Sequence, residues 1–562
     1  MNDIPFLFNG QPIAARAGQS LAAALAEAGR RSLRDTAGGA QRGMFCGMGV
    51  CQDCLVTVDG APNQRACMTV AKAGMVVQRQ IALPKLSQPG TGPAGHTRTI
   101  EPDVLVIGGG AGGLSAAIEA RRAGVTVILL DERKVPGGQF YKQPANAAML
   151  DAQQKEGAAL VAEAAASGAE IIAAAEIWGA FDGPSFMADC GGSALVARPR
   201  TAIVATGAYE RPVFAPGWTL PGVMTTGAAQ TLWRSYRTLP GRRVAFCGSG
   251  PLNLQVALEL ARGGADVALI AERAPSPAGR PAAALAMLAA GPATGAKGAA
   301  MLAELKARGI TPRHRTELVR VEAQGHQLAA RFRSASGTET THVVDALCMN
   351  AGFEPQNEIL RLLGAEMRYD PTVGHLRCNR GPDMQTSVTG IYAVGDCAGL
   401  GGAPRALAEG RIAGRAAAQA AHGEAPPADA DGQRRLARIR RFQSRLWALY
   451  DISPQRLHDV PPETLICRCE ELTLGQLQHG ITTQPAHAGT LKRATRAGMG
   501  RCQGRYCGPV LMRLVAEAAG KAIDDRSYFA PRVPIKPMGI AAMIAGEDAL
   551  DDLPQLVSSI DG

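Results

Sequence analysis

The sequence predicts an α/β protein in which two strand–turn–helix–strand units are flanked by a small cysteine-rich domain at each end. Three observations support this fold class. Residues 103–132 and 243–273 each contain an apolar strand, a glycine turn, a helix and a second strand. Eight of the 13 cysteines fall into two tight groups, one near each end of the chain. At 562 residues the chain is too long for one core and requires several domains.

The first unit has the residues of a dinucleotide-binding turn. The run Val104–Ile107 is apolar and β-branched, which is typical of a strand buried on both faces. In the G-x-G-x-x-G turn that follows, Gly108 allows the bend, Gly110 lets the backbone approach a pyrophosphate, and Gly113 lets helix and strand pack closely. Asp131 ends the second strand, where a carboxylate binds a ribose 2′-hydroxyl. These features predict a dinucleotide site, and an ordinary glycine turn is the alternative.

Three later segments complete a pattern that resembles the two-dinucleotide-binding-domain flavoprotein reductases. They are a glycine turn at 136–139, a strand and small-residue turn at 201–207, and a strand at 390–396 that ends in Gly-Asp before a helix at 404–418. The resemblance implies that this Gly-Asp holds the ribityl and pyrophosphate of FAD, and that the following helix directs its positive end at the flavin. The implied FAD-lining residues are Gly108, Gly110, Gly112, Gly113, Asp131, Glu132, Arg133, Gly138, Gln139, Thr206, Gly207, Gly395 and Asp396.

The second unit is inserted between the two halves of the first domain, and its ligand stays open. Asn253 replaces the third glycine of its turn, and Ala271 occupies the expected position of the ribose-binding acid, with Glu272 beside it. NADH, NADPH, an adenine nucleotide held structurally and an empty relic are all alternatives. The candidate ligand-binding residues of this second fold are Gly248, Gly250, Pro251, Glu272 and Arg273.

The N-terminal cysteine group has the spacing of a plant-type [2Fe-2S] domain. Cys46, Cys51 and Cys54 form a C-x4-C-x2-C run, and Cys67 follows after a strand that the sequence predicts over Leu55–Val58. Four thiolates can enclose two irons, and the glycines between the first two cysteines let the loop turn its N–H groups toward sulfur. Zinc is the alternative, although a four-cysteine zinc site usually contains two close pairs.

The C-terminal cysteine group consists of a C-x-C pair, Cys467 and Cys469, and a C-x4-C pair, Cys502 and Cys507. This arrangement resembles the bacterioferritin-associated-ferredoxin type of [2Fe-2S] module. A zinc site or an iron-free relic is the alternative. Isolated cysteines such as Cys397 are interpreted as buried packing residues.

Motif positions and composition predict the domain boundaries. The expected order is a β-grasp-like ferredoxin [2Fe-2S] domain at 1–82, a linker at 83–102, an FAD-binding domain at 103–225 and 346–420, the inserted domain at 226–345, a second linker at 421–434, the helical [2Fe-2S] module with an extended tail at 435–540, and a C-terminal tail at 541–562. Both linkers are rich in proline or glycine. The basic run at 434–445 has apolar residues at helical spacing, which predicts a helix with a solvated basic face.

Composition narrows the class of partner. The net charge is +10, but the basic residues are scattered and rarely alternate with aromatics, so no nucleic-acid partner is expected. Apolar residues make up 46% and charged residues 19%, as in a globular protein. No apolar run is long enough for a transmembrane segment, and the N-terminus lacks the features of a secretory signal. We therefore expect the chain in the cytoplasm, with peripheral attachment to the inner membrane face through a partner as a further expectation.

The domain order resembles the alpha (A) subunit of the opine oxidase, hydrogen cyanide synthase and D-hydroxyproline dehydrogenase family. The resemblance covers nearly the whole chain and rests on RGMFCGMGVCQDC, VLVIGGGAGGLSAA, ATGAYERP, YAVGDC, ICRCE and the R-x-P tail at Arg532 and Pro534. In that family the small ferredoxin is often a separate gamma subunit. Here it is fused at the N-terminus.

The family implies a hetero-oligomer with divided roles. A D-amino-acid-oxidase-like flavoprotein beta subunit would oxidise an amine such as an opine, D-hydroxyproline or glycine. This chain would carry the electrons through FAD and two [2Fe-2S] clusters to a quinone or another acceptor. FMN at a subunit interface is a further expectation of the family. No paired His/Asp or nucleophile signature is present, so no catalytic acid or base is predicted.

Two other functions are compatible with parts of the sequence. The main alternative is a self-sufficient NAD(P)H-dependent reductase that uses the second fold for nicotinamide, which Asn253 and Ala271 weaken. An iron–sulfur assembly or storage partner with a relic flavin fold is the other, and the completeness of the FAD motifs argues against it.

Overall fold

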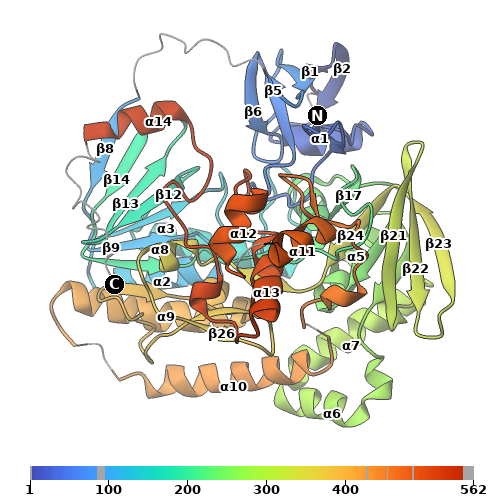
Figure 1. The fold of residues 1–562 in the computed structure, drawn as a ribbon. Helices are drawn as coiled ribbons and strands as arrows, with labels where there is room; N and C mark the ends of the chain where they lie inside the picture. The colour runs from blue at the N-terminus through green and yellow to red at the C-terminus, as the bar shows by residue number, and fades with distance from the viewer. Residues whose placement is uncertain (1–2, 85–94, 426–427, 452, 484–485, 549–562) are drawn as a thin grey trace.

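Figure 1 shows an N-terminal domain in blue, a first α/β domain on the left, an inserted α/β domain in green on the right, and a C-terminal domain in orange and red. The computed structural model describes residues 3–84, 95–425, 428–451, 453–483 and 486–548. Parts of both expected linkers and most of the tail expected at 541–562 lie outside the described residues. Within them, no helix combines the length and apolar character needed to cross a bilayer.

The first α/β domain contains the parallel sheet that the sequence predicts. Its order is β11 (Glu170–Ala173), β10 (Val127–Asp131), β9 (Val104–Ile107), β15 (Thr201–Val204) and β28 (Ile391–Ala393). All four pairings are parallel, and β9 and β15 are buried throughout, as their apolar, β-branched sequences require. Its helices are α2 (Ala111–Arg122), α3 (Ala152–Ala166) and α9 (Gly402–Ala421).

Helices α2 and α9 pack closely because small residues face each other. A Cβ on Gly410 would lie 2.2 Å from the carbonyl oxygen of Gly112, and a Cβ on Gly414 would lie 2.3 Å from that of Ala116. This contact holds the N-terminal ends of both helices beside the carboxyl ends of the strands, where ligands bind in open α/β sheets.

A second sheet of this domain has no counterpart in the sequence prediction. Its order is β12 (Glu176–Phe181), β13 (Ser185–Asp189), β14 (Ala194–Ala197) and β8 (Thr97–Ile100). Strand β8 falls inside the expected linker 83–102, and its parallel pairing with β14 makes it part of the domain. Short elements complete this region: β16 (Ala208–Glu210), β25 (Phe353–Pro355), α8 (Glu358–Leu362), β26 (Met367–Asp370) and β27 (His375–Cys378).

The inserted domain is a second parallel sheet with a three-stranded antiparallel flap. The sheet order is β17 (Val223–Thr225), β24 (Ala346–Asn350), β18 (Arg243–Gly248), β19 (Asp266–Glu272) and β20 (Arg313–His314). Its helices are α4 (Thr226–Tyr236), α5 (Pro251–Arg262), α6 (Pro281–Ala290) and α7 (Pro292–Ala307), and the flap is β21 (Thr316–Gln324), β22 (Gln327–Ser334) and β23 (Glu339–Val344). The predicted boundaries assign β17 and β24 to the FAD-binding domain, but their mutual pairing places both in the inserted sheet.

The N-terminal domain is a mixed sheet closed by one helix. The order is β2 (Gln11–Ala15), β1 (Ile4–Phe8), β7 (Val76–Arg79), β5 (Leu55–Val58) and β6 (Ala61–Arg65), with a separate β3 (Arg34–Asp35) and β4 (Gln41–Arg42) pair. Ser20 caps helix α1 (Leu21–Glu27) by accepting a hydrogen bond from the Ala23 N–H. This cap fixes where the helix begins after the first hairpin.

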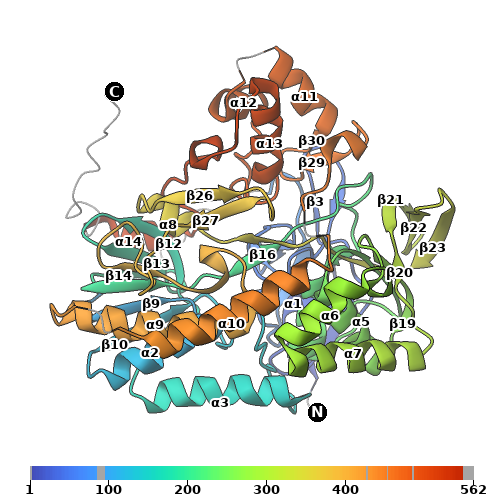
Figure 2. The same ribbon diagram turned by 90° about the horizontal axis from the view of Figure 1, so that it is seen from below.

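The C-terminal domain is small and mainly helical. It contains β29 (Leu465–Cys467), β30 (Leu472–Thr473), α11 (Leu474–Thr482), α12 (Ala488–Thr495) and α13 (Gly508–Ala519). Helix α14 (Ile540–Ala545) packs instead on the second sheet of the first α/β domain, where Thr97 of β8 donates a hydrogen bond to the Ala545 carbonyl (Figure 1). The predicted boundaries place helix α10 (Ala430–Trp447) partly in the linker 421–434 and partly in this domain. Figure 2 shows instead that it runs beneath both α/β domains, alongside α9 and α6.

Candidate redox centre

The glycine turn of the first α/β domain leaves a helix N-terminus open. Gly110 is the N-cap of α2, and no side chain caps it, so the first N–H groups of this helix are available to a phosphate. A Cβ on Gly113 would lie 1.9 Å from the carbonyl oxygen of Gly108, so helix and strand meet as the fingerprint requires. Gly138, in the next loop, lies close to Gly110. A Cβ on Gly138 would lie 2.8 Å from the Gly110 Cα.

Asp131 faces this turn. Its carboxylate accepts hydrogen bonds from the N–H groups of Gly109 at 2.5 Å and Arg133 at 2.7 Å. Burial raises its pKa to about 6. The acid therefore orders the turn and lies where the sequence analysis places a ribose-binding carboxylate.

The Gly395-Asp396 turn lies at the N-terminus of α9. The Asp396 carboxylate accepts hydrogen bonds from the N–H groups of Gly401 and Gly402, at 2.7 and 2.8 Å. The Gly395 N–H donates to Glu409 at 2.9 Å, and Glu409 is in turn paired with Arg380 and Arg405 at 2.6 and 2.7 Å. The sequence analysis missed this buried triad, which holds the turn from behind.

Four of the remaining predicted FAD residues divide into two groups. Thr206 and Gly207 lie beside the turn, where Thr206 donates through Oγ1 to the Gln356 carbonyl. Glu132 and Arg133 lie at the edge of the domain, where their side chains contact other domains. An uncapped helix, closely packed glycines and a facing acid are the features that a pyrophosphate-containing cofactor needs, so these residues fit FAD.

The inserted domain repeats this arrangement, with one correction to the sequence analysis. The expected position of the ribose-binding acid is Ala271, but β19 contains one extra residue, since Val244 pairs with Val267 and Ala245 with Leu269. This register shift places Glu272 opposite Gly248. The Glu272 carboxylate accepts hydrogen bonds from Ser249 Oγ at 2.6 Å and the Gly250 N–H at 3.0 Å. It is therefore the counterpart of Asp131.

The other candidates of the second fold differ in their surroundings. Gly250 is the uncapped N-cap of α5, with Pro251 as the first helical residue. Asn253, in place of the third glycine, is buried and accepts a hydrogen bond from Thr226 at 2.6 Å. Arg273 donates to the Asp451 and Ser453 carbonyls at 2.6 and 2.7 Å, so its guanidinium is bound by a connecting segment.

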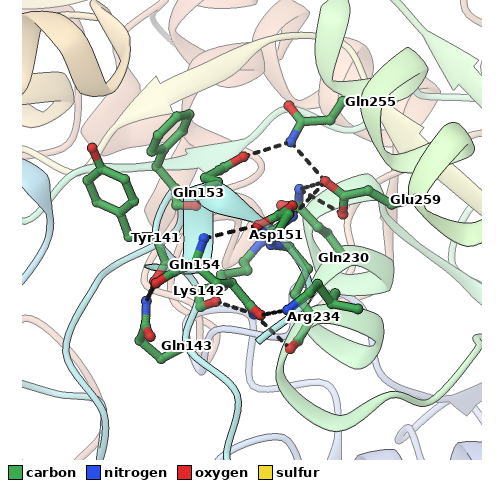
Figure 3. A network of polar contacts seen from close by, with 12 residues as sticks. Tyr141, Lys142, Gln143, Asp151, Gln153, Gln154, Gln230, Arg234, Gln255 and Glu259 are labelled. Carbon is green, nitrogen blue, oxygen red and sulfur yellow. Dashed lines mark hydrogen bonds and ion pairs between the residues drawn. The ribbon is translucent and has the colours of Figure 1, made fainter. Parts of the chain in front are cut away.

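A buried polar network joins the two α/β domains (Figure 3). Arg234 of α4 binds Asp151 at 2.8 Å and Glu259 of α5 at 3.0 Å, and Gln154 donates to the carbonyls of Lys142 and Arg234. Lys142 Nζ donates to Gln230 at 2.9 Å, and burial lowers its pKa to about 7. These contacts fix the second fold against the loop that follows the Gly138 turn.

The four N-terminal cysteines lie together in the folded domain. Hydrogen bonding with Cys67, followed by burial, raises the pKa of Cys54 well above its usual value, and Cys51 and Cys46 raise it further. The N–H groups of Met48 and Cys51 point at the sulfur of Cys46, at 3.5 and 3.4 Å. Such N–H groups stabilise thiolate and sulfide charge.

The four C-terminal cysteines also form two pairs, Cys467 with Cys507 and Cys469 with Cys502. Hydrogen bonding with Cys507 lowers the pKa of Cys467. A Cβ on Gly500 would lie 2.1 Å from the Cβ of Cys469, so the two cysteine loops approach as closely as glycine permits. Two thiols for each iron form the donor set of a binuclear [2Fe-2S] cluster, and two pairs of thiols fit it.

Both cysteine groups contribute to one hydrophobic core. The core contains Cys46 and Cys51 of the first group and Cys467, Cys502 and Cys507 of the second. At its centre Arg468 lies with its guanidinium carbon 3.8 Å from the centroid of Phe45 and 4.7 Å from that of Trp218. The fully buried Asp53, between Cys51 and Cys54, forms ion pairs with Arg468 and, at 2.5 Å, with Arg34.

The first α/β domain contacts the same region. Arg133 donates to the carbonyl of Gly47 in the first cysteine loop at 3.3 Å. Glu132 pairs with Lys536 of the C-terminal segment at 2.8 Å, and Arg65 of the N-terminal domain pairs with Glu176. The strand that ends in the predicted ribose-binding acid therefore continues directly into contacts with both cysteine-containing domains.

Comparisons with known proteins agree with this domain plan. The family model "Pyridine nucleotide-disulphide oxidoreductase" matches residues 102–425. "2Fe-2S iron-sulfur cluster binding domain" matches residues 2–82, and "BFD-like [2Fe-2S] binding domain" matches 465–517. The opine oxidase A subunit of Rhizobium meliloti (strain 1021) is 33% identical over 457 residues, which cover 78% of this chain and 97% of that protein. The chain belongs to the family of opine oxidase A subunits.

Other members and neighbours extend the comparison. In Pseudomonas aeruginosa, hydrogen cyanide synthase subunit HcnB is 31% identical over 458 residues, 78% of this chain and 97% of the relative. Subunit HcnA is 46% identical over 78 residues, 14% of this chain and 75% of the relative. This member of the opine oxidase family thus carries, fused at its N-terminus, a domain that is a separate subunit in hydrogen cyanide synthase. The L-proline dehydrogenase of P. horikoshii shares the fold, with a TM-score of 0.73, 21% identity, and coverage of 96% of this chain and 97% of that one.

The family and the domain plan confirm the predicted class of protein. The chain is an oxidoreductase with an FAD-type domain and two [2Fe-2S]-binding domains. What the sequence analysis missed are the residues between the predicted motifs: Asp53, Arg468, Phe45, Tyr506, Trp218, Glu409 and Lys142. For Asp53, Arg468, Phe45 and Tyr506 the available signal was their position directly beside a grouped cysteine.

Proposed function

We propose that this chain is the electron-transfer subunit of a heteromeric amine or amino-acid dehydrogenase or oxidase. A partner flavoprotein, D-amino-acid-oxidase-like and absent from this chain, oxidises the substrate. The substrate class is a secondary amino acid such as an opine or D-hydroxyproline, or glycine. The electrons pass through FAD and the two clusters to a quinone or another acceptor, in the cytoplasm or at the inner membrane face. FMN at the subunit interface belongs to the same proposal.

The observation that carries this proposal is the one hydrophobic core that contains cysteines of both groups. It adjoins the edge of the first α/β domain, where Arg133 meets the Gly47 carbonyl. A flavin accepts two electrons and releases them singly, and a [2Fe-2S] centre carries one. A flavin domain beside two such centres therefore suits a two-to-one-electron converter. Catalytic acids and bases for amine oxidation would belong to the partner.

In this proposal the eight grouped cysteines hold the clusters. Cys54→Ser and Cys502→Ser are each expected to remove two irons per chain and to spare the other cluster. Cys397→Ser is the control, since Cys397 is buried and its thiol donates to the carbonyls of Val204 and Val394. Iron analysis and absorbance of the purified variants check the assignment. Loss of all iron in Cys397→Ser, or loss of none in the other two, would contradict it.

A self-sufficient NAD(P)H-dependent reductase is the second candidate, and Glu272 at the acid position of the inserted domain favours it. Anaerobic absorbance after addition of NADH or NADPH separates the two functions. Our proposal expects no rapid bleaching of the flavin and cluster bands with either nucleotide, and bleaching when the partner flavoprotein and its amine are added. Rapid bleaching by a nicotinamide nucleotide alone would establish the reductase instead.

A further inference from the structure

One aromatic pair joins the two cysteine loops. Tyr506 directly precedes Cys507 of the second group, and Phe45 directly precedes Cys46 of the first. Their ring centroids are 5.4 Å apart, with an edge-to-face angle of 73°. Tyr506 is 3% exposed and Phe45 is fully buried. The two ligand loops are therefore in contact through these rings, without an intervening layer of protein.

The hydroxyl of Tyr506 is buried without a partner. Among the described residues no group accepts a hydrogen bond from its Oη. The Tyr506 ring contacts Phe45, the residue before Cys46 of the first group. The side chain therefore lies at the first cysteine loop, although the residue belongs to the loop of the second. A buried hydroxyl without a hydrogen-bond partner is destabilising, so an acceptor is expected there.

Arg468 shows the same asymmetry. It lies between Cys467 and Cys469 of the second group, and its Nη1 has no hydrogen-bond acceptor in the part of the chain that the structure describes. Its guanidinium stacks on Phe45 of the first loop. Two donors from the second loop thus remain unpaired at the face of the first. Hydrogen bonds to cluster sulfur are a known determinant of cluster potential.

We propose that Tyr506 donates a hydrogen bond to the sulfur of the first cluster and, with Phe45, couples the two clusters into a pair that exchanges electrons directly. The inference rests on the proposed function, which puts one [2Fe-2S] cluster in each cysteine group. Such an exchange would move one electron from one cluster to the other, so that one would be oxidised as the other is reduced. Tyr506 keeps its proton, and no covalent bond changes. Bound FAD would supply the electrons, and a quinone-type acceptor would remove them.

The test uses the full-length holoprotein. Tyr506→Phe keeps the ring and its packing and removes only the hydroxyl. Tyr528→Phe is the matched control, because the Tyr528 hydroxyl is also without a partner in the described residues. Tyr528 lies instead near Arg361, whose guanidinium carbon is 5.3 Å from the centroid of the Tyr528 ring. Electron paramagnetic resonance during a redox titration gives the potential of each cluster, and Cys54→Ser and Cys502→Ser assign the two signals.

Tyr506→Phe is expected to lower the reduction potential of the first cluster. The hydrogen bond stabilises the reduced cluster, which carries more negative charge, and the variant loses this stabilisation. The expected change is about tenfold in the reduced-to-oxidised ratio, which equals about 59 mV for one electron. Tyr528→Phe should leave both potentials unchanged. The fully reduced wild-type protein should also show magnetic broadening from two interacting clusters.

Equal first-cluster potentials in Tyr506→Phe and Tyr528→Phe would overturn the inference, and so would two non-interacting signals in the wild-type protein. In both cases the iron content stays complete and the proposed function stands. A wild-type chain that lacks either cluster would overturn the proposed function together with this inference.

Discussion

Asp53 and Arg468 form a fully buried ion pair that connects the N-terminal domain to the C-terminal domain. Asp53 lies between two cysteines of the first group, and Arg468 lies between two cysteines of the second. Arg34 binds the same carboxylate from the N-terminal domain. The pair therefore links the first cysteine loop directly to the second.

Removing this carboxylate should destabilise the protein strongly. Asp53→Ala leaves two buried guanidinium groups without their partner, and breaking a buried ion pair costs about 3–5 kcal/mol. We expect a large fall in the melting temperature of the iron-loaded protein and faster loss of the cluster absorbance on heating. Asp266→Ala is the control, because its ion pair with Arg243 is about half exposed and such pairs contribute about 0–1 kcal/mol. Equal melting temperatures of the two variants would contradict a stabilising role for Asp53.

Gly110→Ala should separate FAD binding from folding. The added Cβ meets nothing closer than the Gly138 Cα, at 3.9 Å, and Gly110 has an extended conformation that alanine adopts readily. The fold should therefore persist. The same Cβ would stand at the uncapped N-terminus of α2, where the pyrophosphate is proposed to bind, so FAD affinity should fall at least about tenfold, or about 1.4 kcal/mol. Flavin absorbance per chain measures this.

Gly298→Ala is the matched control, since no atom lies within 4 Å of its added Cβ in helix α7. It should retain FAD and gain about 0.5–1 kcal/mol of stability from reduced backbone entropy. Full flavin content in Gly110→Ala would place the pyrophosphate elsewhere.

Gly500→Ala should remove the second cluster selectively. Its Cβ would lie 2.1 Å from the Cβ of Cys469, a proposed cluster ligand, so the C-x-C loop would have to shift. Gly508→Ala, beside the proposed ligand Cys507, meets nothing within 4 Å and should retain both clusters. Iron content is expected to fall by two per chain in the first variant and to stay constant in the second. Loss of iron from Gly508→Ala but not from Gly500→Ala would mean that the cysteine loops can shift more than their packing indicates.

His375 should make the protein sensitive to acid. Burial, followed by the nearby charge of Arg211, lowers its pKa to about 3 from 6.5. Between these values the unfolded chain binds a proton that the folded chain does not, so stability is lost as the pH falls from 6.5 toward 3. The loss is about 1.4 kcal/mol per pH unit.

His375→Phe should remove this dependence. The free energy of unfolding, measured at about pH 7 and about pH 5, should differ less in His375→Phe than in the wild-type protein. The exposed His458, substituted in the same way, serves as the control. An unchanged difference between the two pH values would show that other groups dominate the acid response.

Local patterns predicted much of this structure. The runs Val104–Ile107 and Leu55–Val58 became strands with the predicted bounds, because short apolar or β-branched runs between turns have few other stable conformations. The glycine spacing at 108–113 predicted the turn because sterics at the strand–helix junction allow little else. The cysteine spacings predicted two [2Fe-2S] domains, and the family models agree.

Properties that depend on register or on docking were not accessible from the sequence. Assigning the acid position to Ala271 is wrong because a bulge beside Val244 shifts the strand by one residue, and such a bulge has no clear sequence signal. The Asp53–Arg468 pair, the Tyr506–Phe45 contact and the Arg234 network each join distant segments. They form only when the domains have packed.

The covalent attachment of the N-terminal domain has a kinetic consequence. A separate small subunit must bind before electrons can pass, so its contribution falls on dilution. Here the Arg65–Glu176 pair and the Arg133–Gly47 contact hold the domain against the flavin-type domain of the same chain. A partner tethered through the chain has an effective concentration of about millimolar order. Internal electron transfer should therefore be first order and independent of protein concentration, whatever the abundance of the chain in the cell.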